Sequence, residues 1–161
     1  MSEHSDPRLD REALREKIIG LGETSLHKSY YPELQSRLAE LERFRALLDQ
    51  TYDAIFLIQA KGGRVVDFNA TAQRYLGYSR EELLSRSFED LVCPEQRSAF
   101  LEYARRKHRS SAESGETYRV SLLTRDGRDI PMEVAFRSVT FGDDRYIVAM
   151  ARDITERIRI E

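Results

Sequence analysis

The sequence predicts an α+β domain in which five antiparallel strands carry short helices on one face, preceded by amphipathic helices at the N-terminus. Two observations support this prediction. Short apolar runs bounded by turn residues occur twice near the middle of the chain and three times in its last third, as expected for strands. Between these two groups lie several short segments that begin with helix-capping residues and have helical apolar spacing.

Length and composition favour one domain with an appendage. The chain has 161 residues, of which 40% are hydrophobic and 34% charged. That apolar content is sufficient for one core, and the high charge indicates long solvated helices. With 26 basic and 28 acidic residues, the net charge is −2, which gives no electrostatic case for nucleic-acid binding.

Cysteine usage and hydropathy indicate the compartment. The single Cys93 excludes an internal disulfide and a cysteine-rich zinc site, and it fits a reducing environment. No apolar run approaches the roughly 20 residues needed to span a bilayer. The N-terminus lacks the apolar core of a secretory signal. We therefore expect a cytoplasmic chain, or a cytoplasmic piece of a longer one, with no membrane segment of its own.

The N-terminal third predicts two helices. Residues 1–32 form an extension in which residues 9–21 carry one apolar stripe, and residues 33–50 form a second amphipathic helix that Pro32 can open. Leucines recur there at nearly heptad spacing, although Arg45 interrupts them. Two interpretations remain open: the helix packs on its own domain, or it pairs with a second chain. The predicted dimer interface consists of Leu34, Leu38, Leu41, Phe44 and Leu48.

The first two strands form a predicted hairpin. Residues 54–59 (AIFLIQ) read as a strand, and residues 64–68 (RVVDF) return as its partner. The turn between them, AKGG, contains two glycines that can adopt positive φ.

Capping residues predict the helices that follow. Asn69 and Ser79 are suitable N-caps, Gly77 can end the first helix, and Pro94 can open the longest one. Helices are expected at residues 70–76, from Ser79, at residues 88–91 and at residues 94–106.

The last third predicts three strands, at residues 116–124, 129–140 and 145–151. The Asp-Gly turn that ends at Gly127 is a strong hairpin signal. Alternation places Met132, Val134 and Phe136 on one face of the second of these strands.

These segments, in this order, resemble the PAS domain. The resemblance is carried by FRALLDQTYDAIFLI, GGRVVDFNATAQRYLGYSREELL, LLTRDGRDIPMEV and ARDITER, and it covers about residues 43–157. It implies a five-stranded antiparallel sheet whose concave face and flanking helices enclose a pocket. We assign residues 51–155 to this domain and residues 156–161 to the start of a C-terminal signalling helix.

The Asp153-Ile154-Thr155 motif implies a relay role. In proteins that this chain resembles, the motif ends the last strand and starts a linker helix into an output domain, such as a histidine kinase, a diguanylate cyclase or a chemoreceptor-like module. Asp153 or Thr155 can cap the new helix. We also expect Asp153 to pair with a basic group on a neighbouring segment. The alternative is an ordinary polar helix start.

No pattern of catalytic or metal-binding residues is present. Gly62-Gly63 lies between strands, so it cannot place a phosphate at a helix N-terminus. His4, His27 and His108 are scattered and have no paired-ligand spacing. We expect neither enzyme activity nor a metal site within this chain.

The family's flavin and haem sensors give further expectations. The position of the flavin-reactive cysteine corresponds to Phe88, and Cys93 lies off that position. The positions of the amides that bond the flavin ring correspond to Leu122, Met132 and Ala151, which offer no polar partner.

The haem-ligating histidine of the family's oxygen sensors corresponds to Ala104, and His108 lies about one turn later. We therefore expect no covalent flavin cysteine and no matching haem ligand, and the cofactor remains unknown.

An apolar pocket is the remaining candidate site. Its side chains either enclose a small ligand or fill the core themselves. We accordingly expect a sensory and relay module that signals to an output domain outside this chain; the alternatives are a ligand-free dimerisation domain and, third, a haem or flavin sensor. The predicted pocket residues are Phe56, Ile58, Phe68, Leu76, Phe88, Leu91, Phe100, Val120, Leu122, Met132, Val134, Phe136, Ile147 and Ala149.

Overall fold

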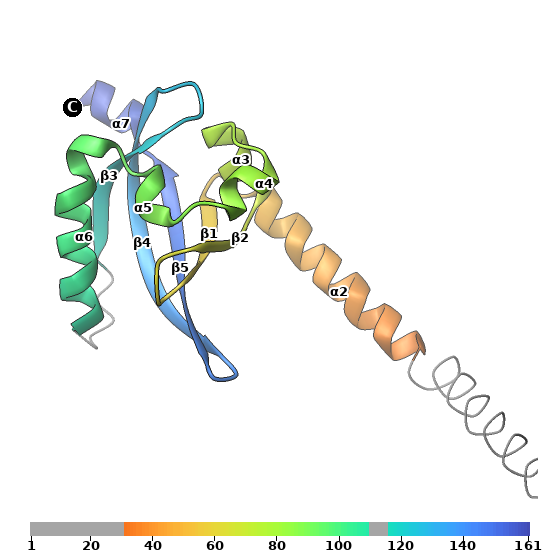
Figure 1. Cartoon of the computed structure of the whole chain (residues 1–161). Coiled ribbons are helices and arrows are strands. Elements are labelled where there is room, and N and C mark those ends of the chain that lie inside the picture. Colours follow the sequence, from red (N-terminus) through yellow and green to blue (C-terminus); the bar gives the residue numbers. More distant parts are fainter. Residues whose placement is uncertain (1–30, 110–115) are drawn as a thin grey trace, which may run out of the picture. The chain divides into compact units, whose positions relative to one another are not determined.

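A five-stranded antiparallel sheet organises the structure, a computed structural model that describes residues 31–109 and 116–161 (Figure 1). The strands lie side by side in the order β2-β1-β5-β4-β3, which places the last strand of the chain at the centre. The predicted sheet is confirmed. The strands are β1 (Ala54–Gln59), β2 (Val65–Phe68), β3 (Thr117–Leu123), β4 (Asp129–Phe141) and β5 (Asp144–Asp153).

The strand register aligns the inward side chains in rows. Phe56 of β1 lies opposite Ala149 of β5, which lies opposite Phe136 of β4. Met132 and Val134 of β4 are buried on the same face, as the predicted alternation requires. The small Ala149 between two phenylalanines leaves room for both rings above the middle of the sheet.

Four helices between β2 and β3 cover one face of the sheet (Figure 1). The predicted helix at residues 70–76 is confirmed without change, and the predicted helix at residues 94–106 continues to Arg109. The helices are α3 (Ala70–Leu76), α4 (Arg80–Leu84), α5 (Phe88–Leu91) and α6 (Pro94–Arg109).

Local capping explains where the short helices begin and end. The Asn69 side chain accepts a hydrogen bond from the Ala72 N–H, and Gly77 ends α3 at a φ of 78°. Ser79 and Glu82 form a reciprocal capping box at the start of α4. The predicted caps at Asn69 and Ser79 are therefore confirmed.

Two helices flank the sheet domain in sequence. Helix α2 (Tyr31–Gln50) begins two residues before the predicted residue 33 and contains no buried residue. Its last turn, from Ala46, belongs to the same compact unit as the sheet. Helix α7 (Thr155–Ile160) follows β5. The predicted helix at residues 9–21 lies outside the described residues.

No helix within residues 31–109 and 116–161 is both long enough and apolar enough to traverse a lipid bilayer.

One continuous apolar core lies between the sheet and the helices. Phe56, Leu76, Leu91 and Leu122 are each fully buried in it, although they come from β1, α3, α5 and β3. Burial of this kind is the main favourable contribution to folding.

Replacing Leu122 by alanine should lower the free energy of unfolding by about 2–5 kcal/mol. The reason is that Leu122 is fully buried, so the shorter side chain would leave a cavity in the core. Urea denaturation followed by circular dichroism measures this loss. Leu57→Ala is the matched control, since Leu57 lies in strand β1 and is only partly buried. Equal losses in the two variants would contradict the assigned core.

Candidate functional site

The predicted pocket residues all lie together on the helix-covered side of the sheet. Phe136 and Ile147 are partly buried, and the other members of the predicted set are buried. The sequence therefore identified one connected set of side chains. Its burial alone does not distinguish a ligand site from a packed core.

Aromatic rings occupy the middle of this set. The Phe88 ring centroid lies 5.4 Å from that of Phe56, 5.6 Å from that of Phe100 and 5.8 Å from that of Phe136. The contacts with Phe56 and Phe136 are edge-on, a favourable geometry for aromatic pairs. A ligand between α5, α6 and the sheet would have to displace at least one of these rings.

The positions that correspond to flavin-binding amides are buried, whereas the one compared with the haem-ligating histidine is exposed. Leu122, Met132 and Ala151 are buried and apolar. Ala104 lies on the exposed side of α6, whereas its neighbour Tyr103 is partly buried and packs near Phe136. Position 104 therefore does not face the core, and the expected equivalence with a haem-ligating position is wrong. Counting residues back from a loop cannot fix which side of a helix faces inward.

Cys93 is buried beside a carboxylate. Its thiol donates a hydrogen bond to Asp129 Oδ1 at 3.0 Å. Burial, followed by this hydrogen bond and the charge of Asp129, raises the pKa of the Cys93 thiol to about 12. The thiol is therefore protonated at neutral pH, when its nucleophilicity is low.

The predicted relay motif lies at the junction of β5 and α7. Asp153 Oδ1 accepts a hydrogen bond from the Thr155 N–H at 2.8 Å and another from the Thr155 hydroxyl. Ile154 is buried, and its N–H donates to the Pro131 carbonyl at 3.0 Å. Asp153 therefore binds the first N–H of α7, but Ile154 occupies the N-cap position and no side chain makes a cap bond there. Ile154 anchors the start of the helix to β4.

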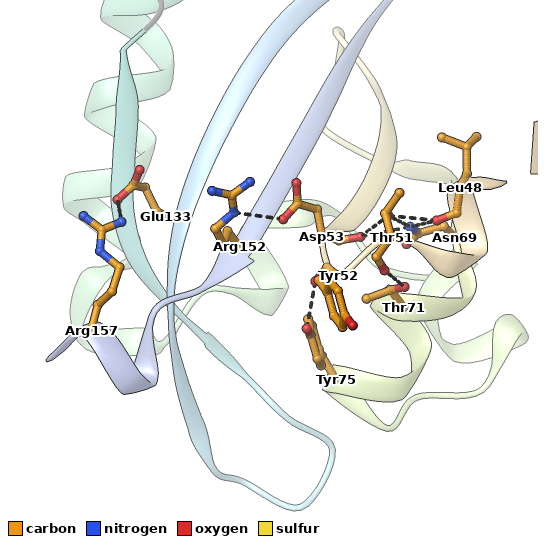
Figure 2. Close-up of polar contacts among 10 residues, drawn as sticks. All are labelled: Leu48, Thr51, Tyr52, Asp53, Asn69, Thr71, Tyr75, Glu133, Arg152 and Arg157. Carbon is orange, nitrogen blue, oxygen red and sulfur yellow. Dashed lines mark hydrogen bonds and ion pairs between the residues drawn. The ribbon is translucent and has the colours of Figure 1, made fainter. Parts of the chain in front are cut away.

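The expected ion pair of Asp153 is wrong: within the described residues, its neighbours make the ion pairs instead. Arg152 Nε lies 3.2 Å from Asp53 Oδ1, and Arg157 Nη1 lies 3.1 Å from Glu133 Oε2 (Figure 2). Successive side chains of a strand point to opposite faces. Asp153 is therefore on the helix-covered side with Met132, and Arg152 is on the outer side with Glu133.

A row of alternating charge crosses the outer face of the sheet at this end. Arg152 lies opposite Glu133, and Glu133 lies opposite Arg119. Asp53 extends the row, since it immediately precedes the Ala54 that pairs with Ala151. Helix α7 contacts the row through Arg157, which pairs with Glu133. Glu161, directly after the helix, lies 3.8 Å from Arg119. Opposite charges on adjacent strands attract across such a face.

Asn69 joins the last turn of α2, the linker after it, β1 and α3. Its Nδ2 donates to the carbonyls of Leu48 at 2.7 Å and Asp53 at 3.0 Å (Figure 2). Its Oδ1 accepts from the N–H groups of Ile55 at 2.9 Å and Ala72 at 3.1 Å. A fifth bond runs from Nδ2 to Thr51 Oγ1 at 3.5 Å. Five bonds of one buried amide therefore fix the end of α2 to the sheet domain.

Side chains of α3 strengthen this attachment. The Thr71 hydroxyl donates to the Thr51 carbonyl at 2.6 Å, and the Tyr75 hydroxyl donates to the Tyr52 carbonyl at 2.7 Å (Figure 2). Partial burial, then the charges of nearby Asp153 and Asp53, raise the pKa of Tyr75. The three linker residues 51–53 are therefore each bonded to α3 or to its N-cap.

Local sequence patterns do not predict this attachment or the charged row. They predict only that Asn69 caps α3, and they give no role to Asp53 or Arg152. A signal for the ion pair was nevertheless present, because the β1–β5 register places these two residues opposite each other one step beyond the last backbone pair. Using it would have required the register of two strands far apart in the sequence.

Comparison with known proteins gives one family. Residues 42–154 match the sequence model of the PAS fold. A curated relative, the methyl sulfide methyltransferase-associated sensor of Methanosarcina acetivorans, is 29% identical over 119 residues, or 74% of this chain. The matched part is 12% of that protein's length.

Solved structures show the same fold. The PAS domain of an HTR-like protein from Haloarcula marismortui is 22% identical, with a TM-score of 0.64 over 76% of this chain and 99% of that one. A PAS domain from a two-component sensor histidine kinase is 19% identical, with a TM-score of 0.60 over 73% of this chain and 98% of that one.

Asn69→Ala should lower the free energy of unfolding by at least about 2 kcal/mol, because buried carbonyl and N–H groups lose their partners. Chemical denaturation measures the change. Ser79→Ala, which removes the cap of α4 alone, should cost only about 1 kcal/mol. If the two variants lose the same stability, the Asn69 amide does not fix α2 and β1 as described.

Cys93 should react with iodoacetamide at pH 8 on the order of a thousandfold more slowly in the folded protein than in urea. The reason is that its pKa of about 12 leaves little thiolate compared with the ordinary value of 9.0. Mass spectrometry follows the alkylation. The same shift means that the contribution of the neutral thiol to stability is complete below pH 9 and is lost as the pH rises toward 12. Rapid labelling of the folded chain would contradict the buried, protonated thiol.

Proposed function

Because the chain belongs to the PAS family, we propose that it acts as a sensory and relay module whose apolar core responds to a small ligand or a protein partner. The observation that carries this proposal is the position of β5. Ala149 of this central strand lies in the core, the strand ends four residues later at Asp153, and α7 begins at Thr155. A shift of the core side chains would therefore reach α7 along one strand.

The output would lie in the parent protein, after α7. The matched sensor of Methanosarcina acetivorans and the PAS domain of a sensor histidine kinase both come from signalling proteins, which supports a signalling parent. A histidine kinase or a diguanylate cyclase is the output that we propose. In this arrangement residues 51–155 form the sensor, and residues 156–161 begin the signalling helix.

We propose that residues 33–50 dimerise two such chains, with residues 1–32 as an extension before them. PAS domains commonly dimerise, and α2 has no buried residue and carries several exposed large apolar side chains. The predicted interface residues Leu34, Leu38, Leu41, Phe44 and Leu48 expose 53%, 51%, 66%, 63% and 39% of their surface. A buried, unpaired Cys93 is compatible with the cytoplasmic location that we propose.

A ligand-free interaction domain is the second candidate. The contacts of Phe88 with Phe56, Phe100 and Phe136 favour it, since these rings already fill the middle of the core. A flavin or haem sensor is a third candidate, and it would require a cofactor to replace the same rings.

Native mass spectrometry of the purified chain, beside its denatured mass, tests these alternatives. A native species that carries extra mass, lost on denaturation, supports the sensor and begins to identify its ligand. A dimer without extra mass that also binds nothing from a small-molecule library supports the interaction domain. A visible absorption band would support the third candidate and contradict the other two.

Replacing Leu34, Leu38 and Leu41 together by alanine should raise the dimer dissociation constant by on the order of a hundredfold or more, because the apolar face is lost. Sedimentation velocity over a range of concentrations measures it. The control is Glu33→Ala with Glu40→Ala, two exposed positions of α2 outside the leucine stripe. An unchanged dimer in the triple variant would exclude this face as the interface.

A further inference from the structure

Arg152 lies between two carboxylates, one in the linker that follows α2 and the other in contact with α7. Its guanidinium pairs with Asp53, which belongs to the linker after α2. Its other neighbour, Glu133, lies directly opposite it on β4 and pairs with Arg157 of α7. The hydrogen bond to Asp53 and the charge of Asp53 raise the pKa of Arg152, and the charge of Glu133 adds a smaller contribution in the same direction.

Glu133 already has two basic partners. Arg157 lies 3.1 Å from it and Arg119 lies 4.0 Å from it, whereas Arg152 forms no ion pair with it in this arrangement. If Arg152 turned from Asp53 to Glu133, it would compete with Arg157 for the same carboxylate. The contact that holds α7 on β4 therefore depends on where Arg152 points.

We propose that Arg152 is a two-position switch that couples the end of α2 to the docking of α7. When Asp53 holds Arg152, Glu133 is available to Arg157 and α7 is docked. When Asp53 is withdrawn, Arg152 turns to Glu133, displaces Arg157 and releases α7. This inference goes beyond the proposed function, because the input comes from the N-terminal helix rather than from the core.

The attachment of the linker explains how α2 would move Asp53. The Asn69 amide group binds the carbonyl of Asp53 and the carbonyl of Leu48 in the last turn of α2. Only residues 49–52 separate Leu48 from Asp53. A displacement of that last turn therefore strains the same amide that positions Asp53, and with it the Asp53–Arg152 pair.

The exposure of these groups favours exchange over permanent pairing. Arg152 and Arg157 expose 68% and 55% of their side chains, whereas their partners Asp53 and Glu133 expose 29% and 23%. Both pairs are therefore open to solvent on the arginine side and covered to a similar degree on the carboxylate side, so neither pairing is strongly preferred. Two pairings of nearly equal free energy are what a two-state element requires. A deeply buried pair could not exchange partners without a large desolvation penalty.

Hydrogen–deuterium exchange of residues 153–161 in the full 161-residue chain tests the switch. Asp53→Asn should speed exchange in this segment by roughly two- to fivefold, the range expected for loss of an exposed ion pair. Arg152→Gln should leave the exchange at the wild-type rate or slow it, because it removes the competitor of Arg157. The double variant should also exchange at or below the wild-type rate, so that the second substitution cancels the effect of the first.

Matched variants complete the experiment. Glu133→Gln should speed exchange both alone and combined with Arg152→Gln, because Arg157 loses its carboxylate in either case. Asp53→Glu keeps the carboxylate and should therefore exchange at the wild-type rate. Arg125→Gln removes an ion pair with Glu82 of similar exposure, 61% and 31% against 68% and 29%, that touches neither linker nor α7. It should leave residues 153–161 unchanged.

Two results would overturn the proposal. The first is a double variant that exchanges as fast as Asp53→Asn alone, since Arg152 would then not mediate the effect. The second is an unchanged exchange rate in Asp53→Asn while Glu133→Gln still speeds exchange, since Asp53 would then not control the docking of α7. Either result leaves the ligand and dimer proposals intact, because mass spectrometry and sedimentation test those separately.

Discussion

The backbone pairing of β5 between β1 and β4 is the interaction on which the other features depend. It brings together the residues that follow α2 and the residues that precede α7, which are about a hundred positions apart in the sequence. The same pairing places Ala149 between Phe56 and Phe136, so the central strand also supports the aromatic core. A change in how β5 sits against either neighbour would therefore alter the core and both ends of the domain together.

Local signals were sufficient to predict most elements from the sequence. Asn69, Ser79 and Gly77 mark helix ends through hydrogen bonds and backbone angles within a few residues, and the structure has them as expected. The inward face of β4 was predictable because alternation is a local property. Two predictions that depend on residues distant in sequence were wrong. Ala104 faces outward on α6, and the ion pairs near the end of β5 are made by Arg152 and Arg157 rather than by Asp153.

The candidate site likewise has one part that the sequence predicts and another that it does not. An apolar set was predictable because burial follows hydrophobicity, and its members do gather on one side of the sheet. Whether that set encloses a ligand depends on ring positions, such as the 5.4 Å separation of Phe56 and Phe88, which no periodicity encodes. Most bonds of the Asn69 amide could not be predicted either, because they join the N-cap of α3 to groups in α2, the linker and β1 that are distant in sequence.

Polar and apolar parts of this domain have different roles for a physical reason. Core side chains such as Phe88 are close-packed, so a ligand can enter only by displacing at least one of them. The arginines of the row from Asp53 to Glu161 are exposed, so its ion pairs can exchange partners without the desolvation penalty of a fully buried pair. The core therefore suits recognition of a signal, while the charged row suits its transfer between the two helices. Because both act on β5, a ligand in the core and a movement of α2 would bias the same docking of α7.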